Sequence, residues 1–421
     1  MKSEIRLISR EELNDFWELV VMADSDLYLS REYKERRVEW FSTILDNYND
    51  FKYYGLFREG KMLGGMALID FKLTLHTTEV NAGGVGMIKV DLLHKKQKVC
   101  KEMITYFIDQ NRDKGSNIVM LYPFNVEFYK KMGFGYGTKV HQFKIKPQNF
   151  PKGNRENLVY ADQDYKEEIL ACYSRYAKKT NGFLDKTWFS TNDMFSGDTR
   201  IVAYRKNNKI SGYIQFRFQR VKTEYEYLSD MVIEEFIYEN SDALKELCAF
   251  IHCQSDQINR VIINTPDDNL KYILSDPTNG HNGSFGGDYL DSYVTGVGIM
   301  YRVTNVIGIF NDLKDHNFNG AHYTLKLTIN DSLYEKNNRS NIIEFKNGSI
   351  VKCFEEKENS NNTFHCEVVL EISDFSSLIT GSIDFRTLHN LGLANVSNSD
   401  YLEILNKTFR FDQKPMCITH F

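Results

Sequence analysis

Two stretches of the chain share one order of apolar and polar residues. GLFREGKMLGGMALI (55–69) alternates like a β-hairpin that turns at Glu59-Gly60, and VAYRKNNKISGYIQF (202–216) alternates like one that turns at Asn207-Asn208. Both have an aromatic residue and an arginine before the turn, and a lysine and a glycine after it. The similarity indicates that one structural unit occurs twice.

The pattern downstream of each hairpin repeats as well. A strand, a helix, a second strand and a proline follow in both copies, with the proline at Pro123 in the first and Pro266 in the second. Six residues after each proline lies a tyrosine, Tyr129 or Tyr272. We therefore expect a tandem duplication of one α/β unit of about 140 residues.

The rest of the chain matches neither copy. SDPTNGHNGSFGGDY (275–289) is rich in glycine and asparagine, which is typical of a loop. From about residue 299, AHYTLKLTI, NIIEFKNGSIVKCFEE and FHCEVVLEI alternate like strands with an Asn-Gly hairpin turn, and helical segments follow. We expect an α/β (α+β) protein with three domains, 1–147, 148–298 and 299–421.

Composition and charge narrow the class of protein. The 421 residues suit two or three domains, and 42% hydrophobic with 26% charged residues is ordinary for a globular chain. A net charge of −5 argues against a general nucleic-acid binder and favours cationic partners. Charges interrupt every apolar run at the N-terminus, and no apolar stretch reaches ~18 residues. We expect a cytoplasmic protein with no membrane partner.

Metal-binding and disulfide patterns are missing from the sequence. The seven cysteines include no C-x-x-C pair, and the ten histidines include no H-E-x-x-H motif. We therefore expect neither a metal site nor a disulfide framework.

A cluster of lysines lies between an expected strand and an expected helix in the first copy. GMIKV (86–90) is typical of a short apolar strand, and from Val99 apolar residues recur at helical spacing. The lysines between them are Lys95, Lys96, Lys98 and Lys101. Cations oppose the dipole at a helix N-terminus, whereas its unpaired N–H groups suit an anion. A bound pyrophosphate would explain the cluster, and a solvated basic face would give the same pattern.

The strand, basic turn, helix and strand, followed by FYKKMGFGYG (128–137), resemble the acetyl-CoA-binding core of the GNAT acetyltransferases. Two such units and a third region resemble the Eis (enhanced intracellular survival) family, which acetylates aminoglycoside amines. The resemblance covers essentially the whole chain, with its specific motifs in 86–137 and at the C-terminus. It implies tandem GNAT domains followed by a sterol-carrier-protein-like α+β domain, with acetyl-CoA as co-substrate.

The family's pyrophosphate-binding pattern, V-x-P-T-H-R-R-R-G, corresponds to VDLLHKKQK (90–98). Val90 and His94 are kept and lysines replace arginines, but Leu92 replaces the proline and Lys98 the glycine. The resemblance implies that the strand at 88–90 pairs with the pantetheine arm and that residues 96–101 hold the pyrophosphate. The cofactor-binding residues it implies are Ile88, Lys89, Val90, Lys96, Gln97, Lys98, Val99, Cys100, Lys101, Phe124 and Asn125.

Two further residues acquire catalytic roles by the same resemblance. Tyr129 matches the family's proton donor, and a phenol can protonate a leaving thiolate as charge develops. The C-terminal carboxylate, here that of Phe421, would be the general base. Without the resemblance, Tyr129 would be interpreted as a core residue and the apolar C-terminus as a segment that only packs.

The second copy lacks the basic turn. Tyr272 has the same place relative to its proline as Tyr129, but Glu234, Glu235 and Glu239 replace the lysines. Carboxylates there would repel a pyrophosphate. We interpret this copy as a degenerate scaffold.

The sequence thus predicts an acetyl-CoA-dependent N-acetyltransferase that acts on amines of a cationic, aminoglycoside-like small molecule. One alternative is a protein or peptide lysine acetyltransferase, and another is a non-catalytic acyl-CoA- or lipid-binding protein. The resemblance also implies a ring-type homo-oligomer such as a hexamer.

Overall fold

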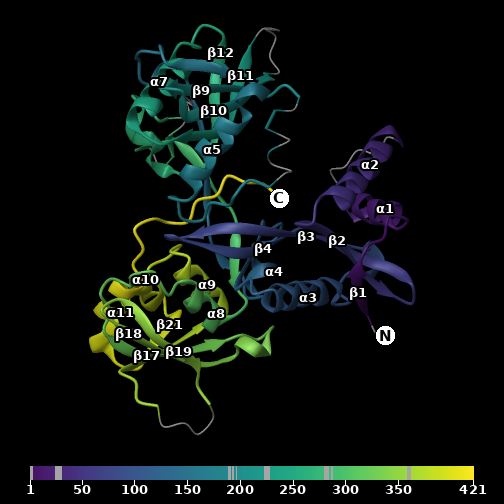
Figure 1. Cartoon of the computed structure of the whole chain (residues 1–421), viewed down its shortest axis with the longest axis vertical. Coiled ribbons are helices and arrows are strands. Elements are labelled where there is room, and N and C mark those ends of the chain that lie inside the picture. The colour runs from purple at the N-terminus through teal and green to yellow at the C-terminus, as the bar shows by residue number, and fades with distance from the viewer. Residues whose placement is uncertain are drawn as a thin grey trace. The chain divides into compact units, whose positions relative to one another are not determined.

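The chain forms two compact units, each built around its own large sheet (Figure 1). The computed structural model describes residues 3–23, 31–187, 191, 194–195, 197–221, 228–278, 284–285, 288–357 and 362–421. The first unit comprises Met1–Gly137, Ile299–Lys414 and Phe421, and the second comprises Thr138–Gly298 and Pro415–His420.

The first unit contains a seven-stranded sheet in the order β1-β2-β3-β4-β5-β16-β6. Its strands are β1 (Glu4–Leu7), β2 (Phe51–Arg58), β3 (Lys61–Leu75), β4 (Thr78–Val90), β5 (Ile118–Leu121), β16 (Met300–Val303) and β6 (Gly135–Tyr136). Only β4 and β5 run parallel among these neighbours. Helices α1 (Leu13–Ala23) and α2 (Arg31–Asn47) lie on one face, and α3 (Val99–Asp113) lies on the other (Figure 1).

Both predicted hairpins are confirmed. Glu59 and Gly60 join β2 to β3 with φ angles of 51° and 77°. Asn207 and Asn208 join β9 (Arg200–Lys206) to β10 (Lys209–Arg220) with φ angles of 52° and 57°. Two successive positive φ angles give the type I′ turn, whose twist matches that of the flanking strands.

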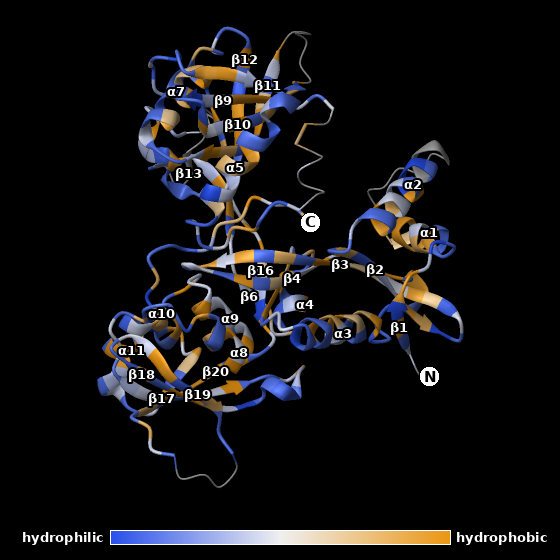
Figure 2. Ribbon diagram, viewed as in Figure 1, coloured by the Kyte–Doolittle hydropathy of each residue, from blue (hydrophilic) through white to orange (hydrophobic). Residues whose placement is uncertain are grey.

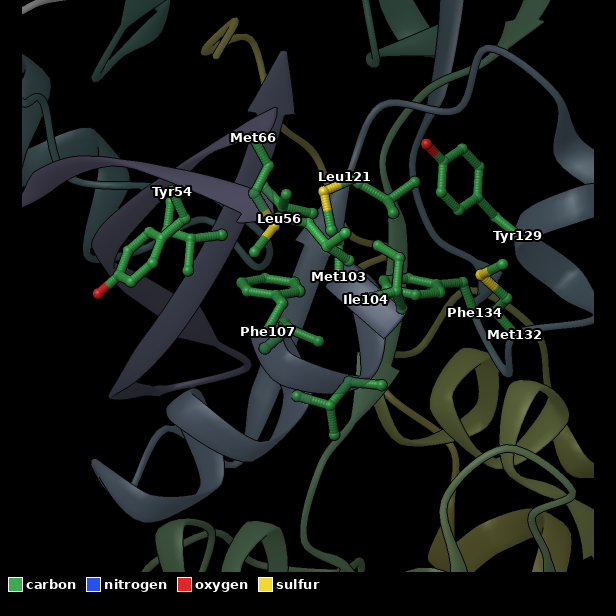
Figure 3. Close-up of a cluster of buried hydrophobic side chains, with 14 of the residues drawn as sticks. Tyr54, Leu56, Met66, Met103, Ile104, Phe107, Leu121, Tyr129, Met132 and Phe134 are labelled. Atoms are coloured by element: carbon green, nitrogen blue, oxygen red, sulfur yellow. The ribbon is translucent and has the colours of Figure 1, made fainter. Parts of the chain in front are cut away.

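The predicted helix after the lysine cluster is also confirmed. It begins at Val99, and the apolar positions Met103, Ile104 and Phe107 are completely buried. They pack against Leu56, Met66 and Leu121 of the sheet (Figure 3). The helix α3 carries both hydrophobic and hydrophilic residues, as an amphipathic helix does (Figure 2). The strand expected at 86–90 is the end of the longer β4.

The second unit repeats the arrangement of the first sheet. Its seven strands lie in the order β15-β7-β12-β11-β10-β9-β8, and only β11 and β12 are parallel neighbours. The bounds not yet given are β15 (Tyr293–Val297), β7 (Lys139–Ile145), β12 (Ile258–Thr265), β11 (Ser229–Tyr238) and β8 (Leu158–Ala161). Helices α5 (Lys166–Ala177) and α7 (Ser241–His252) pack on this sheet.

The two copies exchange one strand. β7 follows β6 in the chain but lies between β12 and β15 of the second sheet, whereas β16 follows β15 but lies between β5 and β6 of the first. The expected boundary at 147/148 therefore differs from the structural one, because the chain leaves the first unit after Gly137. The expected third domain, 299–421, also differs, since β16 completes the first sheet and residues 415–420 belong to the second unit.

The third region forms a five-stranded sheet in the order β19-β18-β17-β20-β21. Its elements are β17 (Tyr323–Asn330), β18 (Arg339–Lys346), β19 (Ser349–Glu355), β20 (Cys366–Glu371), β21 (Ala394–Val396), α8 (Val306–Asp312), α9 (Ile372–Ile379), α10 (Phe385–Asn390) and α11 (Leu402–Thr408). The predicted Asn-Gly turn is confirmed at Asn347 and Gly348, where both φ angles are positive.

The glycine-rich stretch at 275–289 is not entirely loop. Two short strands, β13 (Ser284–Phe285) and β14 (Tyr289–Leu290), pair within it. Residues 279–283 and 286–287 of this stretch lie outside the described residues.

Two negative findings apply to the described part of the chain. No helix there is both long and apolar enough to cross a membrane. No group of three or more His, Cys, Asp or Glu side chains there could hold a metal ion.

A buried ion pair connects the exchanged strand β16 to the rest of the first unit. Arg302 is completely buried, and its Nη2 lies 2.6 Å from Oδ2 of Asp331. Its Nη1 donates a hydrogen bond of 2.6 Å to the carbonyl of Met132, in the turn after α4 (Val126–Lys130). Asp331 Oδ1 accepts from the amide of Tyr334 at 3.0 Å. One guanidinium thus links three segments that are distant in sequence.

We expect Arg302→Ala to lower the free energy of unfolding of the first unit by roughly 3–5 kcal/mol, because it leaves the Asp331 carboxylate uncompensated in a dry core. Urea unfolding followed by circular dichroism measures this. The double variant Arg302→Met, Asp331→Leu is the control and should be clearly more stable than Arg302→Ala. Equal stability of Arg302→Ala and wild type would contradict the buried pair.

Candidate active site

The parallel strands β4 and β5 separate soon after they meet. They pair at Ala82–Ile118, Gly83–Val119 and Gly84–Met120. β5 then ends at Leu121, while β4 continues to Val90. Within the described residues, β4 pairs with β5 only as far as Gly84, and beyond it the pairing continues with β3 alone. This open edge can hydrogen-bond an extended ligand.

A β-bulge lies in the middle of the open edge. Gly65 pairs with Lys89 and Ala67 with Gly86, so Met66 alone faces both Met87 and Ile88. Met87 has a φ angle of +50°, which L-residues seldom adopt. A bulge bends its strand and redirects the backbone, and this one lies in the part of β4 that follows its last pair with β5.

The structure places Ile88, Lys89 and Val90 on this open edge. The side chains of Ile88 and Val90 pack against the core beneath α3. These two side chains therefore belong to the core. Pairing of the strand with the pantetheine arm stays a prediction.

The side chain of Asp91 holds the start of the lysine turn. Asp91 accepts a hydrogen bond from the amide of Leu93 at 2.9 Å, and its Oδ1 lies 2.9 Å from Nδ1 of His94. Lys96 and Lys98 have φ angles of +66° and +65°. The left-handed conformation costs a non-glycine residue roughly 1–2 kcal/mol. Lys98 thus keeps the left-handed backbone conformation that glycine adopts readily, at the position where the family pattern has glycine.

The turn concentrates groups that bind anions. Lys95, Lys96, Lys98 and Lys101 are exposed, and none forms an ion pair with a carboxylate of the described residues. Lys98 is the N-cap of α3, yet within the described structure its side chain makes no capping hydrogen bond. The first N–H groups of the helix therefore remain available to a ligand. The residues present fit a pyrophosphate.

Arg58, at the end of β2, holds this turn and was missed by sequence reasoning. Its Nη2 donates to the carbonyl of Gln97 at 3.1 Å and to Oε1 of Glu102 at 2.9 Å. The side chain is 12% exposed. The arginine before both hairpin turns was the available signal, but Arg205 in the second copy bonds Glu168 of α5 instead.

Tyr129 lies on the short helix α4, which begins after β5. The side chain of Asn125 caps this helix by accepting a hydrogen bond from the amide of Phe128 at 2.9 Å. The Tyr129 ring is 1% exposed and meets the ring of Phe124, itself largely exposed, edge to face at 5.4 Å. Figure 3 shows its hydroxyl pointing away from Met132 and Phe134. The ring therefore belongs to the core, as the simpler interpretation held, while the hydroxyl is directed out of it.

Burial controls the protonation of this region. It raises the pKa of the Tyr129 hydroxyl well above the usual value, and the electrostatic influence of Cys100 raises it further. Burial also raises the pKa of Cys100 to about 12. At neutral pH, Tyr129 is thus a protonated phenol, and Cys100 is a thiol rather than a nucleophilic thiolate.

Phe421 docks on the same strand β4. Its ring contacts Phe71 and Tyr122 with centroid distances of 5.0 and 5.3 Å. Its carboxyl carbon and an oxygen lie 3.3 and 3.4 Å from where a Cβ at Gly86 would be. Glycine at 84 and at 86 thus lets the chain terminus approach β4 just before the bulge. Gly86 was not singled out by sequence reasoning, although the run Gly83-Gly84-Val85-Gly86 was a signal.

The second unit has the same strand divergence, but the described residues before its helix α7 do not form a comparable cluster of anion-binding groups. The N-terminus of α7 is capped by Asn240, which accepts a hydrogen bond from the amide of Ala243 at 2.9 Å. Glu239 pairs with Arg175, and Glu235 pairs with Lys186. Tyr272 is 77% exposed, in contrast to Tyr129. Residues at matching positions of the two units therefore lie in different environments.

Comparison with protein families identifies all three regions. Residues 4–137 and 182–302 each match a family described as an acetyltransferase (GNAT) domain, and residues 313–418 match a sterol carrier protein domain. The first match ends at Gly137, where the chain enters the second unit. A search of curated proteins found no match.

Solved structures share the fold over the whole chain. The chain is similar to a GCN5-related N-acetyltransferase from Anabaena variabilis (18% identity, TM-score 0.80), with 100% of both chains covered. It is also similar to a probable N-acyltransferase from Enterococcus faecalis (15%, 0.79) and to Eis1 from Mycobacterium abscessus (16%, 0.75), again over 100% of both chains. At these identities the likeness concerns the fold alone.

These findings confirm the predicted fold class, two GNAT domains followed by a sterol-carrier-protein-like domain. They also confirm that the chain is a GNAT-type acetyltransferase, an enzyme class that uses acetyl-CoA.

Proposed function

We propose that the first GNAT unit acetylates an amine of a cationic, aminoglycoside-like small molecule, with Tyr129 as general acid and the Phe421 carboxylate as general base. One observation carries the proposal. The terminal carboxyl group lies against Gly86 on the strand whose open edge leads to the lysine turn. The residues that lead to Phe421 are packed, with Cys417 and Thr419 buried, whereas the last residues of a domain are commonly frayed.

The cofactor would be held by the backbone of β4 and by the basic turn. Ile88, Lys89 and Val90 would pair with the pantetheine arm, and the turn from Lys96 to Lys101 would hold the pyrophosphate, with Phe124 and Asn125 bordering the arm. Lysine ammonium groups neutralise phosphates as point charges, and the free N–H groups of α3 add directed hydrogen bonds. When bound, acetyl-CoA supplies an acetyl group activated as a thioester.

Three proton movements accompany the exchange of the C–S bond for a C–N bond. The carboxylate of Phe421 accepts the proton that the attacking ammonium must lose. The pKa of an α-carboxyl group is ordinarily ~3.3–3.7, so the group is ionised at pH 7 and also attracts a cation. The hydroxyl of Tyr129 donates a proton to the departing sulfur. The nitrogen loses its second proton as the amide forms, and this proton restores the Tyr129 hydroxyl.

The raised pKa values are compatible with this donation. A buried phenol is a weak acid, but burial also makes a thiolate more basic, as the pKa of about 12 at neighbouring Cys100 shows. Burial therefore shifts the pKa of a phenol and of a thiol in the same direction. Because Cys100 is protonated, the amine attacks the thioester directly and no acyl-enzyme forms.

The amine class is tested by thiol release from acetyl-CoA with a panel of aminoglycosides, polyamines and lysine peptides. Highest activity on a peptide would favour the protein acetyltransferase alternative. Binding of acetyl-CoA without thiol release on any amine would favour the non-catalytic alternative. A cytoplasmic location and a ring-type oligomer, such as a hexamer, remain predictions.

We expect Tyr129→Phe to lower kcat by roughly 10²–10⁴, the usual contribution of a general acid. Affinity for acetyl-CoA should change little, because the proton is needed only as the thiolate forms. Steady-state thiol release and calorimetry measure the two quantities. Tyr272→Phe, the same change at the matching place in the second unit, is the control and should be nearly silent. A larger loss in Tyr272→Phe would show that catalysis belongs to the second copy.

We expect a C-terminal extension of three glycines to abolish turnover while acetyl-CoA binding persists. Each added residue can move the carboxylate by up to ~3.5 Å, which is beyond hydrogen-bond reach of its present place. Phe421→Leu keeps the terminal carboxylate and is the matched control, which should retain most activity. An extended chain with the untagged rate of thiol release would show that another group is the base.

A further inference from the structure

The strand divergence of the second unit is closed by the end of the chain. β11 and β12 pair for the last time at Ile233–Ile263, and β11 then continues to Tyr238. A void of about 30 Å³ remains there, lined by residues 236–238 of β11, by Ile263 and Thr265 of β12, and by Met416 and Ile418. Such a volume holds about one water molecule.

Residues 415–420 are bound to the second unit along their length. The amide of Met416 donates a hydrogen bond of 2.7 Å to the carbonyl of Asn181. The Tyr173 hydroxyl donates to the carbonyl of Leu184 at 2.9 Å and lies 3.2 Å from Oγ1 of Thr419. Since the phenol proton is used on Leu184, the hydroxyl of Thr419 is the donor in the second bond.

Burial shows that this segment is part of the packed unit. Cys417 and Thr419 are 3% and 6% exposed. Met416 and Ile418 pack against the hydrophobic cluster that includes Tyr173 and Phe183. Hydrogen bonds and apolar packing therefore both hold the segment on the second unit.

Gly182 adapts the second unit to the segment. It has a φ angle of +86°, and a Cβ there would lie 2.7 Å from both N and O of Met416. Any side chain at 182 would have to displace the backbone of the segment. The glycine is thus required by the close approach of the chain end.

We propose that the second GNAT unit is a binding site for the chain's own C-terminal segment, and that it thereby positions the general base. Met416 and Ile418 of this segment line the point where β11 and β12 separate, the strands that correspond to β4 and β5 of the first unit. The inference rests on the proposed role of Phe421. That residue directly follows the bound segment, so binding of 415–420 limits how far its carboxylate can move. Gly182, Tyr173 and Thr419 are positioning residues.

The first test compares Gly182→Ala with Gly197→Ala in the full-length protein. Both glycines have positive φ angles, but a Cβ at Gly197 meets nothing within 4 Å. The readouts are the release of Phe421 by a carboxypeptidase that prefers aromatic residues, kcat, and KM for acetyl-CoA. In Gly182→Ala we expect release about tenfold faster and kcat about tenfold lower, the equivalent of ~1.4 kcal/mol. KM for acetyl-CoA, which reports on the first unit, should stay unchanged, and Gly197→Ala should match wild type.

A second pair of variants, with smaller structural changes, tests the inference if Gly182→Ala fails to fold. Thr419→Val removes only the hydroxyl that bonds Tyr173, and Thr419→Ser keeps it. Thr419→Val should release Phe421 a few-fold faster and lose kcat a few-fold, about the effect of one hydrogen bond. Thr419→Ser should lie close to wild type.

The outcomes separate this inference from the function on which it rests. Faster release of Phe421 with unchanged kcat would support the binding site and overturn the role of Phe421 as base. Unchanged release in Thr419→Val and in folded Gly182→Ala would overturn the binding site, whatever happens to kcat.

Discussion

The separation of β4 from β5 after Gly84 and Met120 is the constraint on which the active-site region depends. A strand that continues without its neighbour exposes backbone groups that must find another partner. The same separation places the N-terminus of α3 beyond the end of β4 and lets β5 pass into the helix that bears Tyr129. Glycine at 86 completes the arrangement, because it allows the terminal carboxyl group to approach the strand at the start of its open edge.

The duplicated unit shows that one backbone geometry can carry two different sets of charged and capping residues. β11 and β12 separate in the same way, but Asn240 satisfies the helix N-terminus and Glu235 and Glu239 are committed to internal ion pairs. The two units share a fold, and they differ in the charges of this region and in the capping of the helix N-terminus. In our account the second copy has exchanged a ligand for a segment of its own chain, so one duplication supplies both an active site and the support for its base.

Sequence reasoning succeeded where the determinants are local. Turn residues at 59–60 and 207–208 specify hairpins, and apolar spacing after Val99 specifies α3. It failed where the interacting residues are distant in sequence. The exchange of β7 and β16 depends on which sheet has room for another strand, and the local sequence pattern does not encode this. Arg58 and Gly86 were missed for the same reason, since their importance lies in contacts with residues 97 and 421. The catalytic roles of Tyr129 and Phe421 came from resemblance and stay proposals.

Isothermal titration calorimetry with acetyl-CoA tests the central claim most directly, namely that the lysine turn of the first unit forms the cofactor site. We expect one site per chain in wild type and loss of binding when Lys95, Lys96 and Lys98 are all changed to Glu. A control with the same change in charge, Lys152, Lys178 and Lys179 to Glu in the second unit, should bind like wild type. Two sites per chain, or unchanged affinity after charge reversal of the turn, would contradict the account.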